Sequence, residues 1–306
     1  MPFRHLIVFR QIVRNALAAL YRSNSRNEEN KYLLGVATIK SQRSCYPNLS
    51  DIRQAEVRVF SQNGEDGILD FIFEKLRLVK PSILEIGVGD FSECNSKFAN
   101  FFRGSGVYLV DSNEGLGQLN DRYRSRRINS QFFFEQIWID AANAKEVFSR
   151  AKAKLGTIDV LSIDIDGNDF WVLQQIPLDD LQVIVVEYNP SLSDSGPITV
   201  VYDANFDRTT KHYSWKYYGA TLEAFQNFLQ GKGFHLIGAT SQGTNAFFIK
   251  SDFVSLFRDV VKNASEYKNM DSREARNKDG TLSYIDIHSE REMLKTLPFI
   301  EVEKKD

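Results

Sequence analysis

Residues 82–90 read SILEIGVGD, a short apolar segment that ends in two glycines and an aspartate. A short apolar run is typical of a strand that is buried on both faces of a parallel sheet. Glycine directly after a strand lets the chain bend sharply and bring its backbone close to a ligand. We therefore expect this segment to be the first strand of an open parallel sheet, with a ligand site at its carboxyl end.

The residues that follow this segment repeat the alternation of strand and helix. Strands are predicted at residues 107–110, 132–139, 158–165 and 183–186, and helices at residues 92–102, 142–155 and 169–175. Such βαβ units have right-handed crossovers, which place the carboxyl ends of all strands at one edge of the sheet. The sequence thus predicts an α/β fold with a doubly wound sheet, preceded by a helix at residues 67–78.

Three further segments follow the fifth strand. Residues 189–219 show no clear periodicity, which inside a compact domain favours a functional loop, and we interpret them as a substrate lid. A helix is predicted at residues 221–229, and a hairpin at residues 234–250 around the turn SQGT. We expect an N-terminal helical extension (1–59), a central domain (60–251) and a partly helical C-terminal extension (252–306).

Residues 3–22 carry apolar side chains at helical spacing, with arginines between them. A basic amphipathic helix of this kind can make peripheral contact with an anionic membrane. The alternative is a helix that packs on the domain or on a second copy of the chain in a homo-oligomer, because amphipathic helices are common in soluble proteins. The polar residues 23–60 are predicted to be a loop that leads into short structure.

The composition is that of a globular enzyme. The 306 residues include 38 Lys and Arg against 40 Asp and Glu, and this net charge of −2 disfavours a nucleic-acid-binding protein. Cys45 and Cys94 are the only cysteines, too few for a disulfide framework or a zinc cluster. We expect a cytoplasmic protein, with the inner membrane surface as the alternative location if residues 3–22 bind lipid.

The glycine bend restricts the class of ligand. Gly87 and Gly89 are not followed by the third glycine of the dinucleotide fingerprint, and Glu85 stands beside them. A pyrophosphate would require that glycine-lined helix start, so the pattern favours a cationic or phosphate-free nucleoside. Asp111 follows the second strand, where a ribose-binding acid is expected. Asp140 follows the third strand and could receive an adenine amino group; either aspartate could instead cap a helix.

A second polar group follows the fourth and fifth strands. Asp164 and Asp166 project to one side of their strand, and Glu187 and Asn189 follow the neighbouring strand. Crowded carboxylates repel one another unless they are protonated or neutralised by a cation. Oxygen ligands suit Mg²⁺ or Mn²⁺, so we predict a metal site at Asp166, Glu187 and Asn189.

Metal-free interpretations of these residues stay open. In one, Asn168 or Asp169 caps the next helix, and Asp164 contacts the amine of the cofactor. In the other, Asp166 or His212 acts as a general base. The aromatic residues around His212 suit stacking on a sugar ring, although they equally suit a core.

Together these motifs resemble the class I S-adenosylmethionine-dependent methyltransferases over residues 60–250. More narrowly, SQNGEDG (61–67), DIDGND (164–169), EYN (187–189) and YGA (218–220) resemble the FkbM-like branch, many of whose members are associated with sugars or surface polysaccharides. The resemblance implies a Rossmann-like sheet of seven strands with an antiparallel last strand. Phe91 departs from the family pattern, because it occupies the position of the commoner third glycine.

The resemblance also implies roles for the matching residues. Glu85, Gly87 and Gly89 would line the amino-acid and ribose end of S-adenosylmethionine, while Asp111 would bind the ribose and Asp140 would face adenine. The residues that would cover the cofactor from upstream are Gln62, Asn63 and Gly64. The implied activity is O-methylation of a sugar, or of another hydroxylated small molecule or glycan. The alternative is a non-catalytic nucleoside-binding or protein-interaction module on the same fold.

Overall fold

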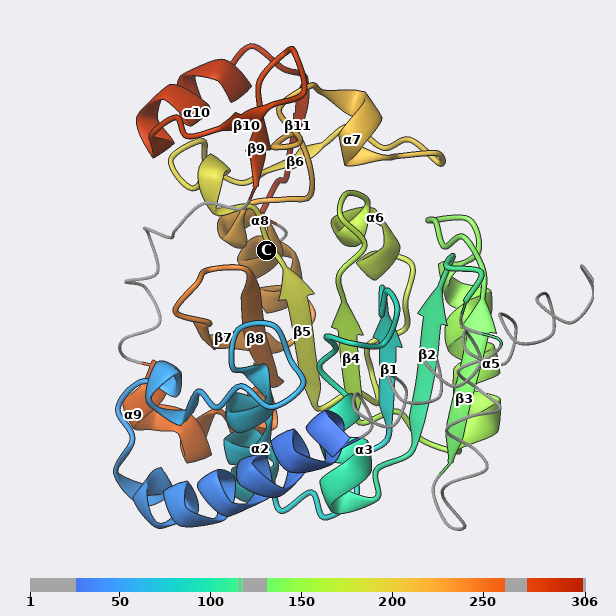
Figure 1. Ribbon diagram of the computed structural model, residues 1–306, viewed down its shortest axis with the longest axis vertical. Helices are drawn as coiled ribbons and strands as arrows, with labels where there is room; N and C mark the ends of the chain where they lie inside the picture. The colour runs from blue at the N-terminus through green and yellow to red at the C-terminus, as the bar shows by residue number, and fades with distance from the viewer. Residues whose placement is uncertain (1–25, 116, 118–130, 262–273, 305–306) are drawn as a thin grey trace, which may run out of the picture.

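The computed structural model describes residues 26–115, 117, 131–261 and 274–304. Its centre is a seven-stranded sheet with the order β3-β2-β1-β4-β5-β8-β7 (Figure 1). The strands are β1 (Ile83–Ile86), β2 (Val107–Asp111), β3 (Phe132–Gln136), β4 (Val160–Ile163), β5 (Val183–Glu187), β7 (Phe234–Ala239) and β8 (Asn245–Lys250). The first five strands are parallel, and β8 runs antiparallel between β5 and β7. The predicted doubly wound sheet and its terminal hairpin are confirmed.

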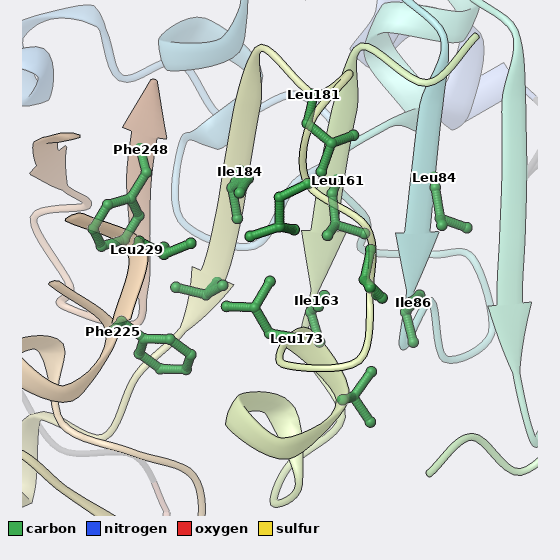
Figure 2. Close-up of a cluster of buried hydrophobic side chains, with 14 of the residues drawn as sticks. Leu84, Ile86, Leu161, Ile163, Leu173, Leu181, Ile184, Phe225, Leu229 and Phe248 are labelled. Atoms are coloured by element: carbon green, nitrogen blue, oxygen red, sulfur yellow. The ribbon is translucent and has the colours of Figure 1, made fainter. Parts of the chain in front are cut away.

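Helices cover both faces of this sheet because its strands are apolar on both sides. One face packs against α5 (Ala144–Leu155), α6 (Asp169–Leu173) and α8 (Leu222–Gln230). Figure 2 shows this layer, where Leu84 and Ile163 of the sheet share a core with Phe225 and Leu229 of α8. The other face packs against α2 (Glu65–Leu76), α3 (Lys97–Arg103) and α9 (Arg258–Val261). The parallel strands β1, β4 and β5 are therefore buried along their whole length, whereas the edge strand β3 is only partly buried.

The helix predicted at residues 92–102 begins later, at Lys97. The buried Glu85 carboxylate accepts hydrogen bonds from the backbone N–H groups of Asn95 (2.6 Å) and Ser96 (2.9 Å). An anion at these amides satisfies donors that a helix leaves unpaired at its start. Residues 87–96 consequently form a long bend after β1 instead of a first helical turn.

Residues 26–42 are helical, which corrects the loop predicted over residues 23–60. Ile39 is fully buried and packs with Tyr32 and Val36 against Phe98 of α3. Burial of one apolar face stabilises this helix, although Leu33 and Leu34 on it stay exposed. The predicted helix of residues 1–22 lies outside the described residues. Among the described residues, no helix is both long enough and apolar enough to span a bilayer.

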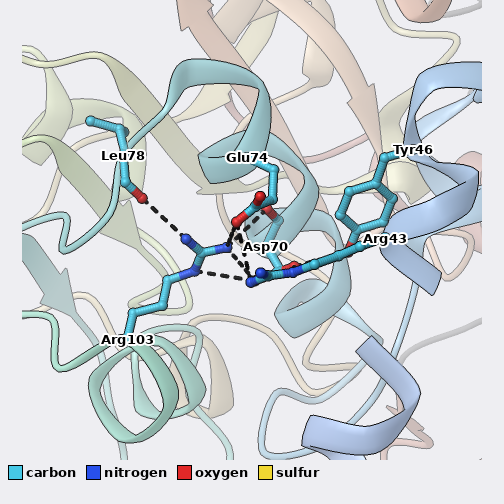
Figure 3. Close-up of polar contacts among 6 residues, drawn as sticks. All are labelled: Arg43, Tyr46, Asp70, Glu74, Leu78 and Arg103. Carbon is cyan, nitrogen blue, oxygen red and sulfur yellow. Dashed lines mark hydrogen bonds and ion pairs between the residues drawn. The ribbon is translucent and has the colours of Figure 1, made fainter. Parts of the chain in front are cut away.

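Arg43 joins this N-terminal region to the domain through Asp70, which also pairs with Arg103 (Figure 3). The buried Asp70 of α2 accepts hydrogen bonds from Arg43 (2.8 and 2.9 Å) and is paired with Arg103 of α3. Tyr46 donates its hydroxyl to the same carboxylate at 3.1 Å. A buried carboxylate is tolerated here because charged and hydrogen-bonding partners surround it.

The segment predicted to be a substrate lid packs against residues from the end of the chain. Within residues 189–219, β6 (Ile198–Val200) pairs antiparallel with β11 (Phe299–Glu301) from the end of the chain. Helix α10 (Ile287–Leu294) contributes Leu294 to a core that also holds Val200 and Phe206. We refer to residues 189–219 together with 275–302 as the cap. It lies beyond the carboxyl ends of the strands, next to β5 and α6 (Figure 1).

A buried ion pair ties the two parts of the cap together. Lys216 Nζ lies 3.1 Å from Glu290 Oε1, and both side chains are 1% exposed. Ser191 also donates its hydroxyl to Glu290. Because these contacts join residues far apart in sequence, the C-terminal segment belongs structurally to the lid.

Candidate functional site

A cavity of about 460 Å³ opens at the carboxyl edge of the sheet, where β1 and β4 meet. Its wall is made by the bend after β1, the ends of β2 to β4, and Phe206 of the cap. Strand order reverses between β1 and β4, and ligands of open α/β sheets bind at such a switch point. The predicted site residues in this wall are Gln62, Glu85, Gly87, Gly89, Asp111, Asp164 and Asp166.

The two glycines of the bend serve different purposes. Gly87 has a φ of +89°, and a Cβ at this position would lie 1.6 Å from the carbonyl oxygen of Asp164. Gly87 thus lets the backbones after β1 and β4 approach closely. Gly89 has a φ of +56°, but a Cβ there would meet no atom within 4 Å. The space above Gly89 is therefore available to a ligand.

Asp111 closes the bend from the neighbouring strand. Its Oδ2 accepts a hydrogen bond from the N–H of Gly89 at 2.7 Å, and its Oδ1 accepts one from the N–H of Asn113 at 2.8 Å. The carboxylate lines the cavity and is held at a defined position by two backbone amides. A carboxylate so placed can accept hydrogen bonds from a pair of neighbouring hydroxyls.

The cavity is strongly acidic. The acidic side chains in its wall are Glu85, Asp90, Glu93, Asp111, Asp164 and Asp166. None of the described residues that line it is Lys, Arg or His. Burial raises the pKa of Glu85, although its hydrogen bonds to Ser96 and Asn95 oppose that shift. Such a wall attracts a cationic ligand and repels a diphosphate.

Three carboxylates converge beyond the glycine bend. Asp164, Asp166 and Glu187 each place an oxygen so that all three atoms lie within 4.8 Å of one another. Asp166 has a φ of +60°, an uncommon value for a residue with a side chain. Its Oδ1 lies 3.5 Å from Nε of Arg208, which belongs to α7 (Arg208–Lys211) of the cap. The cap thus supplies a positive charge to this cluster.

Asp169 holds the loop that carries these acids. It accepts backbone hydrogen bonds from Ile165 (2.8 Å) and Gly167 (2.9 Å), the two residues on either side of Asp166. Full burial raises the pKa of Asp169 to about 6, despite those hydrogen bonds. The predicted capping role therefore takes a different form, since the carboxylate binds the preceding loop and shapes the site.

Asn189 was predicted to be a metal ligand, and the structure corrects this prediction. Its side chain is fully buried in the cap, where the amide donates to the carbonyls of Lys216 (2.9 Å) and Tyr218 (3.0 Å). Its Oδ1 accepts a hydrogen bond from the N–H of Ser191. Asp164 takes the third place in the carboxylate cluster, because the chain turns away after Glu187.

His212 is not in the wall of the cavity. Its Nδ1 lies 2.7 Å from the hydroxyl of Ser214, and its ring contacts Tyr213 at a centroid distance of 4.2 Å. Burial and the nearby charge of Lys278 lower its pKa. Of the two predicted bases, only Asp166 lies in the wall, and His212 ends α7 of the cap.

Three residues that were predicted to contact the cofactor do not line the cavity: Asn63, Gly64 and Asp140. Asp140 accepts hydrogen bonds from the N–H groups of Ala142 (2.8 Å) and Asn143 (3.1 Å) in the turn that precedes α5, and α5 itself has no side-chain cap. Asn63 donates to the hydroxyl of Thr244 at 2.8 Å. Gly64, with a φ of +104°, begins α2. Their direct contact with a cofactor stays a prediction, and the side of the cavity near β3 is formed by Ile137, Trp138 and Ile139.

The sequence analysis missed several amides in the wall, among them Asn168 as a ligand group and Asn245 altogether. Asn168 donates to the carbonyl of Asp203 (2.7 Å), and Asn245 donates to Glu65 (2.8 Å). Among the described residues, the Oδ1 atom of each is buried and accepts no hydrogen bond. The position of Asn245, directly after the hairpin turn, was the available signal.

The sequence matches no protein-family model and no curated protein. Among solved structures, the chain is similar to a fibrillarin pre-rRNA processing protein from Methanococcus jannaschii, with 12% identity, a TM-score of 0.33, and coverage of 56% of this chain and 67% of that one. It is also similar to an O-methyltransferase family 2 protein from Planctomyces limnophilus in complex with apigenin. The identity is 12% and the TM-score 0.33, and the match covers 71% of this chain and 61% of that one. The chain is similar as well to a coclaurine N-methyltransferase bound to N-methylheliamine and SAH. The identity is 10% and the TM-score 0.34, and the match covers 69% of this chain and 64% of that one.

The chain thus spans 61% to 67% of the length of these three proteins. The strand order and the antiparallel β8 establish the fold independently of these distant likenesses.

Proposed function

We propose that this protein is an S-adenosylmethionine-dependent methyltransferase that transfers a methyl group to an oxygen of a sugar or another hydroxylated acceptor. The observation that carries the proposal is the acid-lined cavity at the glycine bend, whose described wall residues include no basic side chain. A sulfonium nucleoside is cationic at sulfur and at its amino group, so it complements this wall. A dinucleotide carries a pyrophosphate and does not.

The residues in the wall fit the parts of such a nucleoside. The open space above Gly89 admits a ribose, and Asp111 is placed to accept hydrogen bonds from its hydroxyls. The apolar side chains near β3, with the indole of Trp138, suit a planar base. Asp164 or Glu85 can offset the charge of the amino group, while Gln62 supplies an amide for the carboxylate.

The acceptor half of the cavity would lie beside the loop after β4 and the start of β8, where Asp166, Asn168 and Asn245 line it. When bound, S-adenosylmethionine supplies an activated methyl group, whose carbon–sulfur bond breaks with its electron pair as the acceptor oxygen bonds to carbon. The protein must hold the two reactants in line, which can account for about 7–11 kcal/mol of the barrier. Asp166, paired with Arg208, is the residue placed to take the hydroxyl proton.

We also propose that Mg²⁺ or Mn²⁺ binds at Asp164, Asp166 and Glu187. The convergence of three carboxylate oxygens within 4.8 Å supports this, because oxygen ligands are what these ions prefer. The ion would offset the mutual repulsion of the carboxylates and would lower the pKa of an acceptor hydroxyl. In its absence, Asp166 alone would serve as the base.

Calorimetry with S-adenosylhomocysteine and with NAD tests the cofactor class directly. We expect binding of S-adenosylhomocysteine and none of NAD at the same concentration. Binding of NAD alone would reject the proposal. Binding of S-adenosylhomocysteine without methyl transfer to any extracted glycan or small molecule would instead support a non-catalytic nucleoside-binding module.

A further inference from the structure

Lys97, the first residue of α3, has a charged side chain that is buried behind the cavity wall. It is 3% exposed and is not among the residues that line the cavity. We propose, building on the proposed function, that Lys97 is a positioning residue that fixes the bend after β1 (residues 87–96), and that Glu28 keeps Lys97 in place. The helix at residues 26–42, which carries Glu28, thereby controls the affinity of the nucleoside site.

The bend after β1 contains a backbone conformation that needs support. Phe91 has a φ of +63°, a value that costs free energy in a residue with a side chain. Its ring packs against Phe132 and Phe134 of β3, and its carbonyl accepts a hydrogen bond from Lys97 Nζ at 3.0 Å. The residues on both sides of Phe91 line the cavity, so its conformation determines the shape of the wall.

The same ammonium group contacts a second segment of the wall. Lys97 Nζ lies 4.7 Å from the ring centroid of Phe60 and 4.9 Å from that of Phe91, and a cation over an aromatic ring is attracted to it. Phe60 is two residues before Gln62, which lines the cavity, and its backbone N–H donates to Asp66 of α2 at 2.7 Å. Lys97 therefore joins the loop before α2 to the bend after β1.

A charge that is buried this deeply needs compensation, which comes from the N-terminal region. Glu28 Oε1 lies 2.6 Å from Lys97 Nζ, and the Glu28 side chain is 22% exposed. Asp90 also interacts with this charge, but it is exposed, so solvent screens the interaction. Because removal of one partner from a buried ion pair is costly, the position of Lys97 depends on the helix at residues 26–42.

Loss of this ion pair reduces the fraction of molecules in which the bend has its binding shape. The apparent affinity of a ligand falls in proportion to that fraction. Neither Lys97 nor Glu28 lines the cavity, so a change in nucleoside affinity on their substitution reports the shape of the bend.

Hydrogen exchange of the full chain, followed by mass spectrometry, tests the positioning role without any ligand. We expect Lys97→Met to accelerate exchange in residues 87–96 about tenfold more than in β5, whose exchange reports global unfolding. Equal acceleration in the two segments means that the substitution only destabilises the fold, and it overturns the proposal. No acceleration in residues 87–96 means that the aromatic packing of Phe91 suffices, which also overturns it.

Calorimetry with S-adenosylhomocysteine tests the role of the N-terminal helix. We expect Glu28→Gln, a milder change that also serves should Lys97→Met fail to fold, to weaken binding about threefold to tenfold. Glu29→Gln is the matched control, because Glu29 is the next carboxylate on the same helix and is exposed. Equal affinity in the two variants, even if Glu28→Gln is less stable to urea, means that Glu28 only anchors the helix and overturns the proposal.

The two measurements separate this inference from the proposed function. If the unsubstituted chain does not bind S-adenosylhomocysteine, the proposed function fails, and hydrogen exchange in Lys97→Met and Glu28→Gln still decides the role of the ion pair. If S-adenosylhomocysteine binds equally to the unsubstituted chain, Lys97→Met and Glu28→Gln, the proposed function stands and the inference about Lys97 fails.

Discussion

Asp111 and Gly89 are joined by a hydrogen bond of 2.7 Å from the glycine N–H to the aspartate Oδ2. They are separated in sequence by a crossover, yet the parallel pairing of β1 and β2 brings the ends of the two strands together. The bond ties the glycine bend to the neighbouring strand end, and it does so in the cavity wall. This part of the cavity wall is thus held in place by the protein's own hydrogen bonds.

Replacing Asp111 with Ala is expected to weaken binding of S-adenosylhomocysteine about tenfold to a hundredfold. This is the range for hydrogen bonds to a charged group. The measurement is calorimetry. The control is Asp159→Ala, which removes a carboxylate that also accepts a backbone N–H, that of Ser82 at 2.8 Å, but before β4 at the opposite edge of the sheet. Unchanged affinity in Asp111→Ala would refute the ribose assignment.

The two glycines of the bend are expected to respond differently to substitution by Ala. Gly87→Ala places a methyl group 1.6 Å from a carbonyl oxygen, so we expect a loss of about 3 kcal/mol or more in the free energy of unfolding. In Gly89→Ala the added methyl group meets no atom within 4 Å. Only the left-handed backbone conformation then lowers the free energy of unfolding, by about 1–2 kcal/mol. Urea unfolding measures both free energies.

Gly89→Ala should nevertheless lose affinity for S-adenosylhomocysteine, because its methyl group enters the cavity. A Gly89→Ala protein that unfolds as readily as Gly87→Ala, or that binds like the unsubstituted chain, would contradict this division of roles.

The buried Asp169 predicts a pH dependence of stability. Its pKa is raised by burial from 3.8 to about 6, so between these values the folded state holds a proton that the unfolded state has released. Stability from this group is complete below about pH 4 and is lost as the pH rises through 6, by at most about 3 kcal/mol. The amide in Asp169→Asn does not titrate, so this variant lacks that pH dependence.

The comparison is therefore made as a difference between two proteins. Urea unfolding at pH 4, 5, 6 and 7 should show the unsubstituted chain losing stability relative to Asp169→Asn as the pH increases. A difference that is constant over this range would show that Asp169 is ionised throughout.

The carboxylate cluster is expected to bind Mn²⁺ in the absence of other ligands. Electron paramagnetic resonance should detect a bound ion, and Glu187→Gln should weaken its binding tenfold or more, because one charged ligand is lost. Glu93→Gln is the control, since Glu93 also lines the cavity but is paired with Arg58 at 2.8 Å and lies outside the cluster. Methyl transfer that is insensitive to EDTA would reject a catalytic metal.

The ion pair inside the cap is expected to stabilise the fold of the C-terminal segment. Lys216→Met leaves the buried Glu290 without its cationic partner, and we expect a loss of about 3–5 kcal/mol, the usual cost of an uncompensated buried charge. Glu292→Gln, which breaks the exposed pair with Lys295, should change stability by less than about 0.5 kcal/mol. Equal effects in the two variants would mean that Glu290 reaches solvent.

The sequence by itself determined the central sheet and the part of the cavity wall that follows β1 and β2. Apolar segments of strand length that alternate with helices form a parallel sheet buried by helices, and that rule placed β1 to β5, while the turn SQGT placed the hairpin. The same rule located Gly89 and Asp111, because polar residues that end neighbouring parallel strands must meet at one edge.

Tertiary structure alone decided the part of the cavity wall beyond β4 and the composition of the cap. The partner of β6 lies at the end of the chain, and no local pattern around Ile198–Val200 encodes that pairing. Asn189 follows β5 as a ligand would, but its amide is taken by carbonyls of the cap. Asn245 enters the site only because β8 inserts antiparallel beside β5. Local periodicity reports which face of an element is buried; it does not report what a loop meets across the fold.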